Sequence, residues 1–280
     1  MERIKQALDR AKKERENNAA GDSTRESEVL QSPTSTPSAA HSSVRADKIV
    51  YSETHVVPVN EQVLDQNRVL GGQSAEMAAD AYRMLRTRVI QRMRDNGWNS
   101  LMVVSPGPGE GKSLTAVNLA ISLAREVTHT VLLVDLDLRR PSVHNFFGYE
   151  PPHGIIDYLR NDVPLPDILF NPSVERLVVL PGKERETNSS EMLSSPRMLD
   201  LIAELKARYP ERIVIFDMPP VLATDDAIAF APNVDGALVV VQSGATKRED
   251  LATTYDLLRG TKIIGSLLNQ AEEPSQSYNY

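Results

Sequence analysis

The sequence has no cysteine, no long hydrophobic run and no excess of basic residues. The absence of cysteine excludes disulfide bonds, thiolate metal ligands and a cysteine nucleophile. No apolar stretch approaches the roughly 18 residues that a membrane-spanning helix needs. Acidic residues outnumber basic ones, 38 to 31, so we expect no nucleic-acid partner. The opening MERIKQALDRAKKER lacks the apolar core of a secretory signal, and we therefore expect a cytoplasmic protein.

Composition divides the 280 residues into four segments. Residues 1–15 place apolar side chains at helical spacing among basic ones, which predicts an amphipathic helix that either docks on a partner or anionic membrane or is simply solvated. Residues 16–65 are rich in Ser, Thr, Pro and Asn and predict a disordered linker, with an extended strand as one option for the more apolar residues 48–70. Residues 66–272 are predicted to form one domain, followed by a polar tail, residues 273–280.

The predicted domain alternates short apolar runs with amphipathic stretches. The runs span residues 101–104, 131–134, 177–180, 213–216, 237–241 and 263–268, and helices are expected at 74–95, 114–125, 191–208 and 247–259. Strands that are apolar throughout are typical of a parallel sheet covered on both sides. We therefore predict an α/β fold, with a mostly parallel sheet and helices on both faces.

A glycine-rich loop, SPGPGEGKS, follows the first of these runs and precedes a helix. Glycines let backbone N–H groups turn toward phosphate oxygens, and a helix N-terminus adds positive partial charge. Lys112 can reach the β- and γ-phosphates, and the Ser113 hydroxyl can ligate Mg²⁺. Pro106 stands where the strict GxxxxGK[ST] pattern has its first glycine. We predict a P-loop NTPase fold that binds ATP and Mg²⁺ through Gly107, Pro108, Gly109, Glu110, Gly111, Lys112, Ser113 and Leu114.

Three aspartates follow buried strands. Asp135 and Asp137 lie in VLLVDLDLRR, and Asp217 ends IVIFD. Because the carboxyl ends of parallel strands meet at one edge of the sheet, we expect these carboxylates to face the phosphates and Mg²⁺. The predicted catalytic residues are Lys112 and the three aspartates, and the predicted metal ligands are Ser113, Asp137 and Asp217.

Two further residues are candidate ligands. Arg139, just beyond the second strand, is predicted to hold a phosphate or a partner's carboxylate, with a plain surface arginine as the alternative. Asn269 follows the last apolar run and is predicted to contact the adenine edge.

The motifs SPGPGEGKS, VDLDLRRPS and IVIFDMPP, in this order within residues 74–280, resemble the bacterial tyrosine kinases (BY-kinases) of exopolysaccharide and capsule synthesis. The opening MERIKQALDRAKKE resembles the N-terminal helix of the exosortase-associated tyrosine autokinase branch. The resemblance implies that Lys112 and Ser113 belong to the Walker A motif, and that Asp217 is the Walker B carboxylate. It assigns Asp135 and Asp137 to a second acidic motif, and either of them is favoured over Asp217 as the base, since Walker B carboxylates commonly serve the metal.

The resemblance also implies an activity and partners. Such enzymes transfer the γ-phosphoryl group of ATP to tyrosines of their own C-terminal tail, usually in a neighbouring subunit, and here those would be Tyr278 and Tyr280. Ring assembly in the family uses a helical E-x-x-R-x-x-R, whose counterpart here is Asp80, Arg83 and Arg86, with Asp in place of Glu. The implied partners are a membrane chain-length-determinant protein (a polysaccharide co-polymerase), which would activate the kinase and recruit it to the inner face of the membrane, and a cognate tyrosine phosphatase.

Two other functions fit the same P-loop. A chromosome-partition or septum-placement ATPase shares this branch, but that class typically carries a lysine early in the loop, where this chain has Gly107. A non-catalytic scaffold, whose ATP state gates a polysaccharide polymerase, would keep the same motifs. Only an activity measurement separates the scaffold from the kinase.

Overall fold

The structure, a computed structural model, describes residues 54–73, 76–209 and 211–271. The helix expected at residues 1–15, most of the predicted linker, and the tail with Tyr278 and Tyr280 lie outside these residues.

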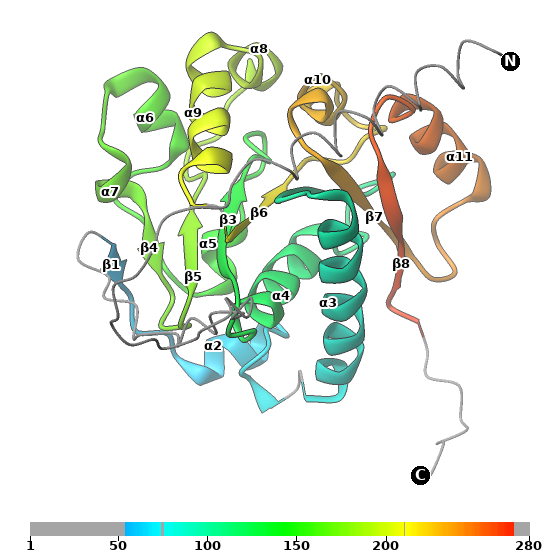
Figure 1. The fold of residues 1–280 in the computed structure, drawn as a ribbon, viewed down its shortest axis with the longest axis horizontal. Helices are drawn as coiled ribbons and strands as arrows, with labels where there is room; N and C mark the ends of the chain where they lie inside the picture. Colours follow the sequence, from blue (N-terminus) through cyan, green and yellow to red (C-terminus); the bar gives the residue numbers. More distant parts are fainter. Residues whose placement is uncertain (1–53, 74–75, 210, 272–280) are drawn as a thin grey trace, which may run out of the picture. The chain divides into compact units, whose positions relative to one another are not determined.

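Eight strands form one sheet within the described residues, in the order β1-β4-β5-β3-β6-β2-β7-β8 (Figure 1). The strands are β1 (His55–Val56), β2 (Ser100–Val104), β3 (Thr130–Asp135), β4 (Phe170–Asn171), β5 (Leu177–Leu180), β6 (Arg212–Asp217), β7 (Gly236–Gln242) and β8 (Ile263–Asn269). Every neighbouring pair is parallel except β4 and β5. The six apolar runs of the sequence are therefore confirmed as strands of a mostly parallel sheet.

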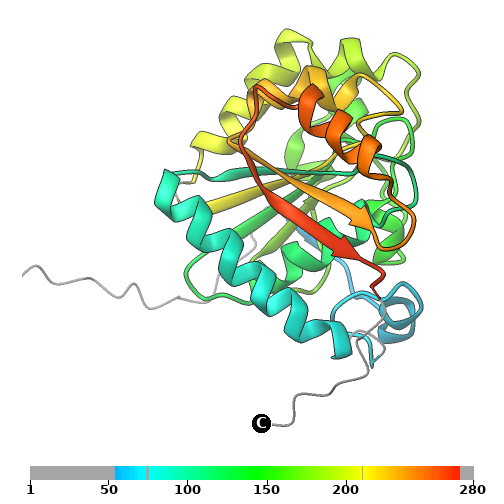
Figure 2. The same ribbon diagram turned by 90° about the vertical axis from the view of Figure 1, so that its right-hand side faces the viewer.

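Helices cover both faces of this sheet (Figures 1 and 2). One core lies between the sheet and the helices α3 and α4, and includes Leu101 and Leu119. A second core, on the opposite face, joins Met102 to α9 and α10. The helices are α2 (Glu61–Gln66), α3 (Glu76–Asn96), α4 (Lys112–Ala124), α5 (Val143–Phe146), α6 (Ile155–Asn161), α7 (Leu165–Ile168), α8 (Ser189–Leu193), α9 (Pro196–Ala207), α10 (Asp226–Phe230) and α11 (Arg248–Leu257), with the 3-10 helix η2 (Ala231–Asn233) after α10. Among the described residues, no helix is both long enough and apolar enough to cross a bilayer.

Two element boundaries differ from those expected. Residues 54–65, assigned to the linker from their sequence, contain β1 and most of α2, because Val57 is buried against the domain and Asn60 caps α2 by accepting a hydrogen bond from Gln62 N. The single helix expected at 191–208 is two helices. Ser195 interrupts it, since its hydroxyl caps α9 and Pro196 occupies the first position of that helix.

A close backbone contact fixes the loops beside the carboxyl end of β3. Gly154 precedes α6, and a Cβ built on it would lie 1.6 Å from the carbonyl oxygen of Gly182. Gly182 in turn lies against Pro141 and the carboxylate of Asp135. No side chain fits between these segments, so glycine is required at both positions.

We expect the Gly154→Ala variant to lose on the order of 3 kcal/mol of unfolding free energy, because the added methyl group must displace the backbone of Gly182. The matched control is Gly260→Ala, where an added Cβ meets no atom within 4 Å and the change should stay within about 1 kcal/mol. Urea unfolding of both variants measures the difference. Equal stabilities would show that the contact is not tight.

Candidate nucleotide and phosphoryl-transfer site

The acidic residues and the glycine-rich loop meet because neighbouring strands end at the same edge of the sheet. β2 leads into the loop, and β3 and β6 end at Asp135 and Asp217. These two aspartates are direct partners in the parallel register of β3 and β6. Lys112 lies within hydrogen-bond reach of Asp137, two residues beyond β3. The structure thus brings Lys112 and the three aspartates together.

The loop between β2 and α4 has the backbone of a phosphate cradle. Gly109 (φ 79) and Gly111 (φ 89) adopt the left-handed conformation that residues with a side chain rarely take. Gly111 is the N-cap of α4, so the unpaired N–H groups of the first helical turn belong to this loop. Pro106 is compatible with the loop because it contributes only its carbonyl, which accepts a hydrogen bond from Leu222 N (3.1 Å).

Lys112 is the one cation in this cluster, and its side chain is only 12% exposed. Its Nζ donates to Asp137 Oδ2 (2.7 Å) and to Ser113 Oγ (3.1 Å), and it lies 3.7 Å from Asp217 Oδ1. Burial by itself would lower the pKa of Lys112, but the carboxylates of Asp217 and Asp137 outweigh it and raise that pKa. The lysine therefore keeps its positive charge at the site.

Asp135 is completely buried and is held by backbone donors. Its Oδ2 accepts hydrogen bonds from Ser142 N (2.9 Å) and Val143 N (3.0 Å). Burial, together with the nearby Asp217, raises the pKa of Asp135 to about 7, against the lowering effect of those two donors. Asp135 therefore fixes the turn after β3 and changes its charge near neutral pH.

The carboxylate of Asp217 is buried and accepts no hydrogen bond. Neither of its oxygens has a hydrogen-bond partner, although Lys112 lies near one of them. Burial raises the pKa of Asp217, and the charge of Lys112 opposes that rise. Unpartnered buried carboxylate oxygens are uncommon and fit a cation that prefers oxygen ligands. The residues present thus fit the Mg²⁺ expected from the sequence, and its ligation by Ser113, Asp137 and Asp217 stays a prediction.

A second hydrogen-bond chain ties the loop to the ends of β7 and β8. Glu110 Oε1 accepts from Thr246 Oγ1 (2.7 Å), and the backbone oxygen of Glu110 accepts from Asn269 Nδ2 (2.9 Å). Asn269 also lies against Gly111, where a Cβ would come within 2.0 Å of its Nδ2. Asn269 is therefore at the loop, and its contact with adenine stays a prediction. Thr246 was missed because a threonine in a connecting loop carries no sequence signal.

Arg139 has partners within the chain. Its guanidinium donates to Asp226 (3.1 and 3.4 Å) and lies 3.9 Å from Asp225. The hydrogen bond to Asp226 raises the pKa of Arg139 further. The buried Asp226 also accepts from Ser189 Oγ (2.7 Å). Asp225, Asp226 and Ser189 were not singled out from the sequence, and a role for Arg139 toward phosphate stays a prediction.

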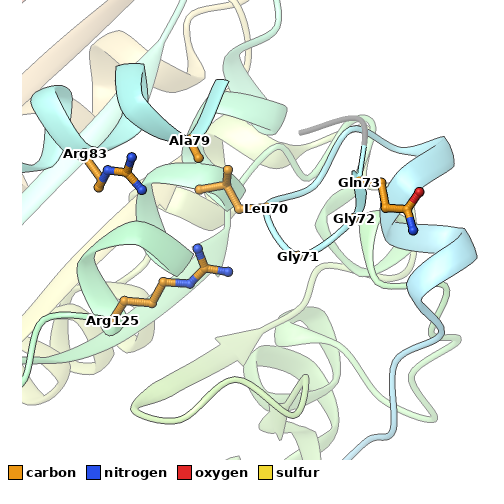
Figure 3. Close-up of a pocket in the computed structure, with 7 residues that line it drawn as sticks. All are labelled: Leu70, Gly71, Gly72, Gln73, Ala79, Arg83 and Arg125. Carbon is orange, nitrogen blue, oxygen red and sulfur yellow. The ribbon is translucent and has the colours of Figure 1, made fainter. Parts of the chain in front are cut away.

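Asp80, Arg83 and Arg86 lie on α3, away from this cluster. Asp80 and Arg83 form an exposed ion pair with each other, and Arg86 donates to the carbonyl of Ser122 in α4 (3.1 Å). A cavity of about 420 Å³ adjoins Arg83, and Arg125 also lies on its wall (Figure 3). Their role in a subunit contact stays a prediction.

The raised pKa of Asp135 makes stability fall with rising pH. Between pH 3.8, its ordinary pKa, and about pH 7, this carboxyl group is ionised in the unfolded chain but still protonated in the folded chain. The free energy of unfolding therefore falls as the pH rises across that window. We expect Asp135→Asn to reduce the loss between pH 5 and pH 8 by on the order of 2 kcal/mol. Urea unfolding at both pH values tests this, with the exposed Asp200→Asn as control. An unchanged pH dependence in Asp135→Asn would contradict it.

Comparison with known proteins places this site in a family. Residues 101–279, more than half of the chain, match the family described as the CobQ/CobB/MinD/ParA nucleotide binding domain. Tyrosine-protein kinase YwqD of Bacillus subtilis (strain 168) is 34% identical over 208 residues, covering 74% of this chain and 86% of YwqD. Tyrosine-protein kinase etk of Escherichia coli (strain K12) is 30% identical over 209 residues, 74% of this chain but only 28% of that longer relative.

Solved structures agree with these relatives. The kinase domain of Escherichia coli tyrosine kinase ETK superposes with a TM-score of 0.67 at 28% identity, covering 80% of this chain and 86% of that one. The chimerical protein CapA2B2 gives a TM-score of 0.68 at 26% identity, covering 78% and 94%. With the nucleotide-binding family matched over residues 101–279 and a named tyrosine kinase identical at 34% of the aligned residues, the chain belongs to the bacterial protein-tyrosine kinases.

Proposed function

We propose that this kinase transfers the γ-phosphoryl group of ATP to Tyr278 and Tyr280 of a neighbouring copy and thereby regulates exopolysaccharide synthesis or export. The observation that carries the proposal is the buried cluster in which Lys112 contacts Asp137 and lies close to Asp217, directly beside the glycine-rich loop. Phosphoryl transfer needs a cation at the phosphates, a metal ligand and a base, and this cluster supplies all three side-chain types.

The loop and Lys112 bind the phosphates. The backbone N–H groups at the start of α4 offer donors to the β- and γ-phosphates. Lys112 leaves Asp137 for these phosphates, because a polyphosphate offers it more negative charge than one carboxylate does. Ser113 and Asp217 hold Mg²⁺, which when bound neutralises charge on the phosphate oxygens.

The acceptor base is Asp137. The Asp137 carboxylate is 7% exposed and is bonded only by Lys112 and by Arg140 N, whereas Asp135 is fully buried and held by three backbone donors. Once Lys112 turns to the phosphates, Asp137 Oδ2 is free to accept the tyrosine proton. The phenolic oxygen then bonds to the γ-phosphorus, the bond from that phosphorus to the β–γ bridging oxygen breaks, and ADP leaves with the electron pair.

The rival ATPase function has only the fold in its support. The septum site-determining protein MinD of Pyrococcus horikoshii OT3, complexed with Mg-ADP, superposes with a TM-score of 0.50 at 23% identity, covering 61% of this chain and 69% of that one. Gly107 occupies the loop position where that class typically carries its additional lysine. The named kinases match at higher identity, so the kinase function is favoured.

The partners belong to the same proposal. A membrane chain-length-determinant protein activates the kinase and holds it at the inner face of the membrane, and a tyrosine phosphatase reverses the reaction. Copies of the chain associate, with a ring as one arrangement, through the exposed Asp80 and Arg83 on α3 and through Arg86 beside them. The similarity to CapA2B2 and to the relative named CapB supports a membrane-associated partner.

Intact-mass measurement after incubation with Mg·ATP tests the reaction. We expect phosphate on the wild type and on the exposed-lysine control Lys247→Met, but none on Lys112→Met, which loses the cation at the phosphates. The variant with both Tyr278→Phe and Tyr280→Phe should also stay unmodified. Phosphate on that double variant would move the acceptor elsewhere, and hydrolysis of ATP without any protein phosphate would favour the ATPase or scaffold.

Separate variants identify the base. We expect Asp137→Asn to slow autophosphorylation by about 10²–10⁴-fold while ATP still binds, because the proton acceptor is lost and the phosphates replace the lost partner of Lys112 in the nucleotide complex. Asp135→Asn should slow it less, because Asp135 positions the turn rather than the substrate. Single-turnover rates at saturating ATP, with nucleotide affinity measured separately, distinguish the two. A larger loss for Asp135→Asn than for Asp137→Asn would assign the base to Asp135.

A further inference from the structure

The loop that follows β3, residues 136–142, carries the proposed base Asp137. The Asp137 carboxylate is bonded by Lys112 Nζ (2.7 Å) and by Arg140 N (3.1 Å). When Lys112 turns to the phosphates, as proposed above, the loop loses this link to the start of α4. A separate attachment is then needed to hold Asp137 in place while the phosphoryl group is transferred, because a displacement of about 1 Å is enough to slow a reaction by about 10²-fold.

Arg139, two residues beyond Asp137, attaches the same loop to a buried carboxylate. Its Nε donates to Asp226 Oδ2 (3.1 Å) and its Nη2 to Asp226 Oδ1 (3.4 Å), so both oxygens of that carboxylate are engaged. The Asp226 side chain has no exposed surface, whereas that of Arg139 is 39% exposed. A two-point contact fixes the orientation of both groups, because the planar guanidinium matches the edge of the carboxylate.

Asp226 is held in turn by a third segment. It is the first residue of α10, and its Oδ2 also accepts from Ser189 Oγ (2.7 Å), the first residue of α8. α8 and α10 pack against each other, and Glu186 N, just before α8, donates to Leu138 O (2.8 Å). The clamp, by which we mean Arg139, Asp226 and Ser189, thus fastens the loop after β3 to two helices.

The adjacent Asp225 shows why this role falls on Asp226. Asp225 lies 3.9 Å from the Arg139 guanidinium, but its side chain is 72% exposed and accepts from Ser190 Oγ (2.9 Å). An exposed pair at this distance contributes little, because water screens the charges. The fully buried Asp226 needs a compensating cation, and Arg139 supplies it.

We propose that Asp226 is a positioning residue for phosphoryl transfer: through the clamp it keeps the loop after β3, and with it Asp137, in place once Lys112 has moved to the phosphates. This rests on the proposed function, since it takes Asp137 as the base. Asp226 acts through Arg139 and needs no contact with nucleotide or acceptor. Loss of the clamp therefore lowers kcat and leaves the KM for ATP unchanged, because ATP is held by a different segment, the glycine-rich loop with Lys112.

Kinetics of the full chain separate this role from a general loss of stability. We expect Asp226→Asn, which keeps the size of the side chain but not its charge, to lower kcat for autophosphorylation by about 10- to 100-fold while the KM for ATP changes less than about twofold. The matched control Asp225→Asn should stay within about twofold of the wild type in both constants. Equal losses of kcat in the two variants would overturn the proposal.

Arg139→Lys covers the case in which Asp226→Asn does not fold, since it keeps the positive charge but loses the two-point contact. We expect a lower kcat here too, and the double variant Arg139→Lys with Asp226→Asn should be no more than about twofold slower than the slower single variant, because both changes break one link. Additive losses would overturn the proposal. A higher KM for ATP in Arg139→Lys with kcat unchanged would assign Arg139 to the phosphates, which also overturns it.

Amide hydrogen exchange tests the clamp without any chemistry. The N–H groups that donate to the carboxylates of Asp135 and Asp137 include those of Arg140, Ser142 and Val143. With Mg²⁺ and a non-hydrolysable ATP analogue bound, we expect Asp226→Asn to speed exchange in the peptide of residues 136–143 by at least about tenfold, because the loop is released.

The same experiment contains its controls. The peptide of residues 237–241, in β7, should exchange at the wild-type rate, and Asp225→Asn should leave both peptides unchanged. Wild-type exchange at residues 136–143 in Asp226→Asn, or equal acceleration in both peptides, would overturn the proposal. If the wild type transferred no phosphate to tyrosine, the proposed function would fail, whereas the exchange comparison would still decide whether the clamp holds the loop.

Discussion

The ion pair between Lys112 and Asp137 is the interaction on which the active site depends. One buried ammonium group stands among three carboxylates, 2.7 Å from Asp137 and 3.7 Å from Asp217. Carboxylates this deeply buried are unfavourable without a compensating charge, and removing one partner of a buried pair typically costs about 3–5 kcal/mol. Burial first, and neighbouring carboxylates second, raise the pKa values of Asp135 and Asp217. The proposed Mg²⁺ would compensate this buried negative charge once Lys112 turns to a phosphate.

The parallel sheet makes this concentration of charge possible. Asp135 and Asp217 are register partners on β3 and β6, and β2, which delivers the loop, pairs with β6 on its other side. Strand interiors buried on both faces anchor these ends, so the carboxylates are placed by backbone hydrogen bonds rather than by flexible surface segments. The tight contact of Gly154 with Gly182 closes the cluster beside Asp135.

Much of this arrangement could be predicted from the sequence, because its signals are local. Uniformly apolar runs indicated the parallel strands, and the loop residues Gly109, Gly111 and Lys112 indicated the phosphate site with the aspartates around it. An extended strand was one option for residues 48–70, which contain β1, but β4 was missed, since two residues carry no periodicity. The split at Pro196 was missed because apolar spacing continues through it. The contacts of Glu110 with Thr246 and of Arg139 with Asp226 join residues far apart in the chain, and only the fold brings them together.

Several of the finer predictions concern residues outside the described part. The assignment to the exosortase-associated branch, the N-terminal helix at residues 1–15, the ring and the phosphatase stay predictions.

The exchange of partners by Lys112 is the central claim, and a crystal structure with Mg²⁺ and a non-hydrolysable ATP analogue tests it most directly. We expect Lys112 Nζ to leave Asp137 Oδ2, from its present 2.7 Å, for a phosphate oxygen, with Ser113 and Asp217 next to the metal. A bound nucleotide with Lys112 still paired to Asp137, and with the metal held elsewhere, would contradict the account.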